Sequence, residues 1–338
     1  MDFKKKSHHN LVPIWLLTMI ILVFLMIMIG GLTRLTDSGL SITEWELFSG
    51  IFPPFTENNW KEYFNLYKEI PQFKLVYPTM TLEEFKIIFY WEYLHRLLGR
   101  IIGLVFLIPL IIFSLKKIIN KQTLYIFYFI FFLILLQGLI GWYMVESGLV
   151  NNTAVSHFRL SLHLFFAFLI ISFLVWNYFN FKYNENKSFF NFNNLLPKIL
   201  LSLILFQIIL GAFVSGLDAG LIYQTWPKMN LTYFPDDLVI DKFDLIYLFN
   251  SQSFVQFLHR VFAYFIVAFT LFIGIKMYVE KQLKYLKSYF LVLFVMSIQI
   301  ILGIFTLVSG LNLYLASLHQ ITSVILVFSA LNLNYKLS

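Results

Sequence analysis

The feature that most constrains this chain is a series of long apolar runs without a charged side chain. No charge occurs between Lys6 and Arg34, and none occurs between Lys287 and Lys336. A helix needs about 20 apolar residues to cross a bilayer, so the first run is long enough for one crossing and the second for two. Charged residues make up only 13% of the chain, whereas soluble domains carry about 25%. The chain is therefore expected to be an all-α integral membrane protein.

The apolar runs predict eight transmembrane helices. Their expected ranges are about 11–33, 87–114, 122–145, 159–181, 197–217 and 254–275, followed by two helices within 288–335 that separate at Ser309-Gly310-Leu311-Asn312. Lysines gather before the first helix and in the loops after the second, fourth and sixth, whereas residues 34–86 hold eight acidic against five basic residues. Because cytoplasmic loops carry the excess of Lys and Arg, both termini are predicted to be cytoplasmic. We expect neither a cleaved signal peptide nor an organelle transit peptide.

Charge and cysteine content exclude several functions. The net charge of +7 lies mainly in the predicted cytoplasmic loops, which indicates membrane topology rather than nucleic-acid binding. The chain contains no cysteine, so disulfides, cysteine-ligated zinc, iron–sulfur clusters and thiol catalysis are excluded. Any metal must be held by histidine, carboxylate or main-chain groups.

The two halves of the sequence repeat one another. Glu92-Tyr-Leu-His95-Arg96 matches Gln256-Phe-Leu-His259-Arg260, Ser161-Leu-His163 matches Ser317-Leu-His319, and Asp37 with Trp45 matches Asp218 with Trp226. Gln207-Ile-Ile-Leu-Gly211 also recurs as Gln299-Ile-Ile-Leu-Gly303. Each copy begins in the cytoplasm, so we expect two parallel-repeat four-helix bundles, over residues 1–185 and 186–338, related by an axis along the membrane normal. The first copy carries a long outer loop, residues 34–86, with short surface helices and turns.

Four of the seven histidines are the main functional candidates. His95, His163, His259 and His319 each lie near the outer start of an even-numbered helix, at nearly one depth by the 1.5 Å rise per residue. One such histidine could be a packed polar residue, but ionisable groups within a span are costly and usually functional. His8 and His9 in the N-terminal tail, and His157, have no repeat partner.

Two facing imidazoles in a four-helix bundle form a bis-axial haem site. Zinc or copper usually recruits more ligands. We therefore predict two haem irons, one ligated by His95 with His163 and one by His259 with His319. The residues four positions after the histidines are small, which would leave room for a macrocycle or would serve close helix packing; they are Gly99, Ala167, Ala263 and Ser323.

Arginines at the same level are candidates for binding haem propionates. Arg96, Arg260 and Arg34 are the proposed cofactor-binding residues, with Arg159 nearby. Arginine pairs well with carboxylates. The alternative is that these side chains extend to the membrane interface.

The halves differ beside the first histidine. Glu92 lies three residues before His95, whereas Gln256 holds the matching place before His259. A proton-coupled oxidation requires such a carboxylate, although Glu92 could instead pair only with Arg96, one turn along the helix. We predict that the first half is the reaction site and that the second holds a permanent haem that relays electrons.

At these residues the chain resembles the heme A synthase family of cytochrome oxidase assembly proteins, in its cysteine-free branch. The resemblance covers almost the whole chain and includes Gly30-Gly31-Leu32-Thr33-Arg34-Leu35-Thr36-Asp37-Ser38-Gly39-Leu40-Ser41, Glu92 to Arg100, and Thr225-Trp226-Pro227. It implies oxidation of the C8 methyl group of haem O to a formyl group, in a bacterial inner membrane. It also implies that His95 and His163 hold the substrate haem O, that Glu92 is the essential carboxylate, and that His259 and His319 ligate a haem b cofactor. The implied partners are haem O synthase and cytochrome oxidase assembly factors, with a homo-oligomer left open.

Two other function classes stay open. A di-haem electron-transfer cytochrome would share the histidine pairs but would not need Glu92. A transporter would share the internal repeat, although no span is obviously broken near the midplane.

Overall fold

The computed structural model describes residues 11–45, 49–150, 152–190, 194–238 and 244–338. Eight helices within these ranges are long and apolar enough to cross a membrane, which confirms the predicted number of spans. They are α2 (Leu11–Leu35), α5 (Leu82–Leu115), α6 (Lys121–Leu149), α7 (His157–Tyr183), α8 (Leu195–Gly216), α10 (Gln252–Val279), α11 (Leu286–Val308, preceded by η3, Leu283–Tyr285) and α12 (Leu313–Leu337). The N-terminal Lys4, Lys5, Lys6, His8 and His9 lie outside the described residues.

Capping residues explain where the helices begin. α5 starts five residues earlier than expected because Thr81 and Glu84 form a reciprocal capping box, which adds an acidic turn that hydropathy does not detect. α11 and α12 separate at the predicted position, where Gly310 and Leu311 have φ of 70° and 63°. Asn312 then caps α12 by accepting hydrogen bonds from the N–H groups of Tyr314 and Leu315.

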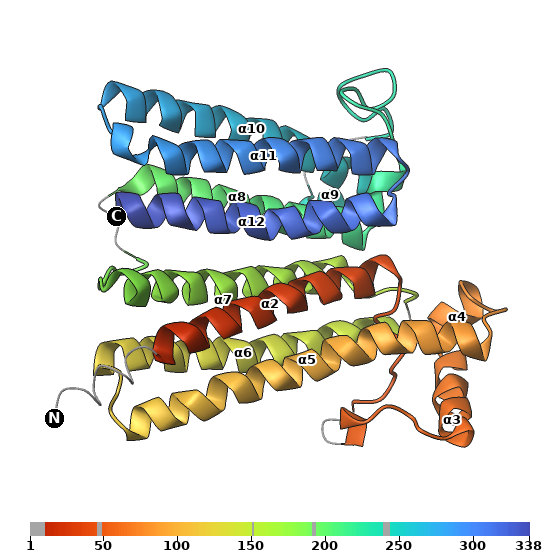
Figure 1. Cartoon of the computed structure of the whole chain (residues 1–338). Coiled ribbons are helices and arrows are strands. Elements are labelled where there is room, and N and C mark those ends of the chain that lie inside the picture. Colours follow the sequence, from red (N-terminus) through yellow and green to blue (C-terminus); the bar gives the residue numbers. More distant parts are fainter. Residues whose placement is uncertain (1–10, 46–48, 151, 191–193, 239–243) are drawn as a thin grey trace. The chain divides into compact units, whose positions relative to one another are not determined.

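By its contacts the chain divides into two compact units, Met1–Leu174 and Val175–Ser338, with the boundary inside α7. In the first unit α2 packs along α5, and α5 packs against α6 (Figure 1). Trp15 of α2 joins them, since its indole N–H donates to the carbonyl of Val105 at 2.9 Å and its ring meets Phe127 of α6. The expected functional division after residue 185, and the symmetry of the two copies, stay predictions.

The second unit is built on two helix pairs. α11 and α12 lie side by side, and α8 packs against both α10 and α12 (Figure 1). The segment between α8 and α10 contains η2 (Ala219–Leu221) and α9 (Leu245–Asn250). Asp237 fastens this segment to α10, because its carboxylate accepts hydrogen bonds from Ser253 and Tyr223, both at 2.5 Å. These two hydrogen bonds, that of Ser253 first, hold the pKa of Asp237 below its usual range.

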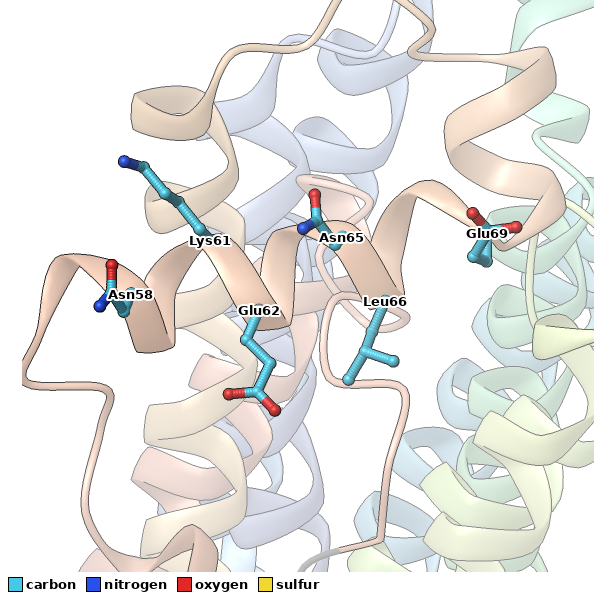
Figure 2. A pocket seen from close by; sticks show the side chains of 6 residues that line it. All are labelled: Asn58, Lys61, Glu62, Asn65, Leu66 and Glu69. Carbon is cyan, nitrogen blue, oxygen red and sulfur yellow. The ribbon is translucent and has the colours of Figure 1, made fainter.

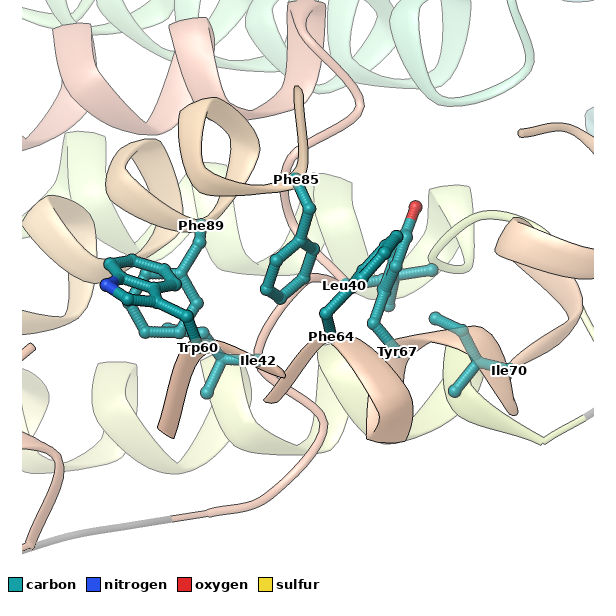
Figure 3. Close-up of a cluster of buried hydrophobic side chains, with 8 residues drawn as sticks. All are labelled: Leu40, Ile42, Trp60, Phe64, Tyr67, Ile70, Phe85 and Phe89. Carbon is teal, nitrogen blue, oxygen red and sulfur yellow. The ribbon is translucent and has the colours of Figure 1, made fainter. Parts of the chain in front are cut away.

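The segment between α2 and α5 folds into the expected short helices, η1 (Ser49–Ile51), α3 (Glu57–Lys68) and α4 (Pro71–Leu75). Apolar side chains of α3, of Ile70 before α4, and of Leu40 and Ile42 after α2 form one cluster with the first turns of α5, as Figure 3 shows. Phe85 of α5 is fully buried at its centre, with ring centroids 5.1 Å from Phe64 and 5.2 Å from Tyr67. Burial also raises the pKa of Tyr67, whose hydroxyl donates to Gln72. This segment is therefore a packed layer on the end of α5.

Replacing Phe85 by alanine should loosen this layer. Loss of a buried phenylalanine typically costs about 3–5 kcal/mol, so α3 and α4 should open more often. Limited proteolysis should then cut residues 57–80 at least tenfold faster. Phe55→Ala is the matched control, since that ring is 76% exposed. Equal proteolysis of the two variants would contradict the central role of Phe85.

Candidate functional site

The first histidine pair comes together in the structure. His95 of α5 and His163 of α7 have ring centroids 6.3 Å apart, with the rings inclined by 56°. A bond from a metal to an imidazole nitrogen is about 2.0–2.1 Å long, and the ring centre lies roughly 1 Å beyond, so two imidazoles on opposite sides of one metal have centres about 6 Å apart. The observed separation therefore fits bis-axial ligation of a haem iron. Within the described residues no cluster of three or more histidine or acidic side chains could hold a metal ion.

The second pair lies in the other unit. His259 is on α10 and His319 is on α12, and the two rings are within electrostatic reach of one another. His95, His163 and His259 stand 20 residues before the ends of their helices and His319 stands 18 before, as the helix bounds give. Each histidine thus lies at a similar distance from the C-terminal end of its own helix, and a common depth in the membrane stays a prediction. Ligation of one iron by His259 and His319 stays a prediction.

Each of the four imidazoles packs against a glycine of another helix, and sequence reasoning missed these contacts. A Cβ atom added to the glycine would lie only 2.8–3.3 Å from the Cε1 atom of the histidine. We call these residues the facing glycines: Gly30 for His95, Gly141 for His163, Gly211 for His259 and Gly303 for His319. Because a methyl group there would crowd the ring, glycine lets the Cε1 edge of each imidazole approach the neighbouring helix closely.

Glutamines one turn before three facing glycines contact the same histidines. The side-chain amide of Gln137 donates to the backbone carbonyl of His163 at 2.8 Å, and that of Gln207 donates to the carbonyl of His259 at 2.9 Å. Gln299 places its amide nitrogen 3.4 Å from Nε2 of His319. We call Gln137, Gln207 and Gln299 the anchoring glutamines. The spacing of glutamine and glycine in α6, α8 and α11 is the sequence signal that could have found them.

Glu92 is buried and accepts four hydrogen bonds. One carboxylate oxygen accepts from the Ser41 hydroxyl at 2.7 Å and from the Ile42 N–H at 2.9 Å. The other accepts from Nε and Nη2 of Arg96, at 3.0 and 2.6 Å. The expected pairing of Glu92 with Arg96 is therefore present. The carboxylate also joins α5 to the segment that follows α2.

Arg96 and Arg260 bind equivalent backbone carbonyls in the two units. Arg96 donates to the carbonyls of Ile42 and Glu44, at 2.8 and 3.1 Å. Arg260 donates to those of Tyr223 and Thr225, at 2.7 and 2.9 Å. Both guanidinium groups therefore hold the chain that leaves the preceding span. Pairing with haem propionates, which the sequence suggested, stays a prediction for them.

The other two arginines make local contacts. Nη1 of Arg34 pairs with the carboxylate of Asp37 at 2.9 Å. Asp37 also accepts from the Tyr77 hydroxyl at 3.0 Å. Arg159 donates to the carbonyl of Tyr143 at 2.6 Å and lies over that ring. These contacts place Arg34 at the junction of α2 with its loop.

A separate surface hollow is unrelated to the histidines. Figure 2 shows it along one side of α3, where polar side chains predominate. Its lining residues all come from residues 58–69, the segment of α3 and the residue after it. Neither histidine pair nor Glu92 contributes to it.

Comparison with known proteins identifies the family. Residues 13–331 match the model of a family described as "Cytochrome oxidase assembly protein". The chain is 48% identical to the heme A synthase of Pelagibacter ubique over 96% of this chain and 95% of that protein. It is 40% identical to the heme A synthase of Flavobacterium psychrophilum and 39% identical to that of Rickettsia prowazekii, in each case over 95% of this chain and 96% of the relative. The chain belongs to the family of cytochrome oxidase assembly proteins.

Proposed function

We propose that this protein is a heme A synthase, which oxidises the C8 methyl group of haem O to a formyl group and so supplies haem A for cytochrome oxidase. The observation that carries the proposal is the 6.3 Å separation of the His95 and His163 rings, in a chain that matches proteins named heme A synthase along nearly its whole length. A haem supplies the iron that two such imidazoles would bind. The protein would lie in the bacterial inner membrane, with both termini cytoplasmic and the histidines near the outer face.

The two histidine pairs would have different tasks. His95 and His163 would hold the substrate haem O, and His259 with His319 would hold a haem b cofactor that relays electrons. The facing glycines support both assignments, because they let all four rings approach their partner helices closely.

Glu92 would act as the carboxylate of the reaction. The Glu92 carboxylate lies between the guanidinium of Arg96 and the N–H of Ile42, and it also accepts a hydrogen bond from the Ser41 hydroxyl.

Haem analysis tests the activity directly. The chain is expressed together with a haem O synthase, and the extracted haems are identified by mass spectrometry. We expect haem A or its hydroxylated precursor. Haem b alone, at two per chain, would instead favour a di-haem electron-transfer cytochrome.

Glu92→Gln should keep both haems but lose product formation. Gln256 shows that an amide at the equivalent place is compatible with the same arginine and loop contacts. Since general acid–base catalysis typically contributes 10²- to 10⁴-fold, we expect haem A to fall by about 100-fold or more. Glu83→Gln, which changes a 79% exposed carboxylate on the same helix, is the control. Normal haem A output from Glu92→Gln would remove Glu92 from the mechanism.

His259→Ala should remove the haem b cofactor. The purified variant should lose one of two haems per chain, measured by the pyridine haemochrome spectrum. His157→Ala, which changes a histidine without a repeat partner, should retain both. Low-spin haem b at full occupancy in His259→Ala would show that this residue is not a ligand.

A further inference from the structure

The four histidines differ in how firmly the protein holds them. His319 differs from the other three in that its Nδ1 has a partner, since it lies 3.0 Å from the carbonyl oxygen of Gln299. The amides of Gln299 and Gln207 also approach Nε2 of His319 and of His259, at 3.4 and 3.5 Å. A hydrogen bond from Nδ1–H to a carbonyl fixes the tautomer in which Nε2 is free to bind a metal. His259 and His163 follow, since an anchoring glutamine binds the backbone carbonyl of each.

His95 has no such contact. Its ring packs on Gly30 and lies beside His163, and its Nδ1 is buried without a partner, as are those of His163 and His259. What sets His95 apart is that, among the described residues, no glutamine contacts its ring or its backbone carbonyl, whereas one contacts each of the other three histidines. The place of the anchoring glutamine is taken by Met26, four residues before Gly30, as Gln207 lies four residues before Gly211. A thioether has no N–H to donate.

Met26 contacts α5 in a different way from that in which Gln207 contacts α10. Its terminal methyl group would lie 3.1 Å from a Cβ atom added to Gly99, one helical turn after His95. Met26 therefore reaches the part of α5 that Gln207 reaches on α10, but it makes an apolar contact there. An unbranched thioether also adapts its shape to a neighbour that moves.

We propose that His95 is the exchangeable axial ligand of the substrate haem. It is exchangeable because Met26 takes the place that an anchoring glutamine holds beside the other three histidines. This inference rests on the proposed function, because only a haem that is a substrate must enter and leave at each turnover. On release the bonds from the iron to His95 and to His163 would both break, that of His95 first. Each electron pair would return to its imidazole nitrogen, and the oxidation state of the iron would be unchanged. His163, whose backbone carbonyl accepts a hydrogen bond from Gln137, would keep its position for the next haem.

Burial of the anchoring glutamines costs free energy, which indicates that their amides do more than fill space between helices. The side-chain carbonyl oxygens of Gln137, Gln207 and Gln299 are buried without a hydrogen-bond partner, although buried polar atoms are normally paired. Helix packing alone would be served equally well by an apolar side chain of similar size, as Met26 is. The amides are therefore best explained by their contacts with the histidines.

A reciprocal exchange of side chains tests the inference. The full-length protein, loaded with ferric haem b at both sites in detergent, is mixed with excess apomyoglobin, and haem transfer is followed by its absorbance. The wild-type protein should release haem in two phases, the faster one absent from His163→Ala. In Met26→Gln the fast phase should slow by about two- to tenfold, the effect of one ordinary hydrogen bond. In Gln207→Met the slow phase should speed up to a similar degree.

Met26→Leu and Gln207→Leu are the matched controls, because they change shape without adding a hydrogen-bond donor. Met26→Leu should leave the fast phase unchanged, and Gln207→Leu should resemble Gln207→Met. An unaltered fast phase in Met26→Gln overturns the inference. A fast phase that survives in His163→Ala but disappears in His259→Ala also overturns it, because the faster haem would then belong to the second histidine pair. Binding of only one haem per chain, unaffected by His163→Ala, would instead refute the proposed function.

Discussion

The site depends on the close approach of an imidazole to the backbone of a second helix. Each of the four histidines lies on one span, and its ring rests on a glycine of another. Without a Cβ atom the two helices come close enough for the glutamine one turn away to reach the histidine backbone. In the first pair the two rings lie at a separation that would suit a single iron between them. The positions of the four imidazoles thus depend on glycine residues of neighbouring helices.

A second interaction fixes the chain that covers each site. Arg96 and Arg260 each donate hydrogen bonds to main-chain carbonyls that follow the preceding span, and Arg96 also binds Glu92. A guanidinium offers five donors in a planar group, which suits two carbonyls at once. In the first unit the aromatic cluster around Phe85 adds a packed layer outside this contact. The outer segments are therefore part of the site's framework as well as connections between spans.

The sequence was sufficient for features that one helix carries alone. Hydropathy located all eight spans, the turn at Ser309-Gly310-Leu311-Asn312 separated the last two, and helical spacing placed each histidine at a similar distance from the end of its helix. It did not reveal contacts between helices. Gly30 and His95 are far apart in the chain, and no periodicity within α2 marks Gly30 as the partner. The role of Arg96 was equally hidden, because its acceptors are backbone carbonyls, which every residue possesses.

Two differences between the halves change the surroundings of the first histidine pair: Glu92 stands where the second half has Gln256, and Met26 stands where it has an anchoring glutamine. Gln256 donates a hydrogen bond to the carbonyl of Tyr223. Glu92 cannot donate, and it accepts from the N–H of Ile42 at the equivalent loop position. The change from glutamine to glutamate thus reverses the direction of the hydrogen bond between helix and loop. It also adds a carboxylate, which accepts hydrogen bonds from Ser41 and Arg96. The loss of an anchoring glutamine at Met26 occurs in the same half. A chain that repeats its histidine pairs but changes the residues around them would in this way keep one haem permanently and exchange the other, as we propose.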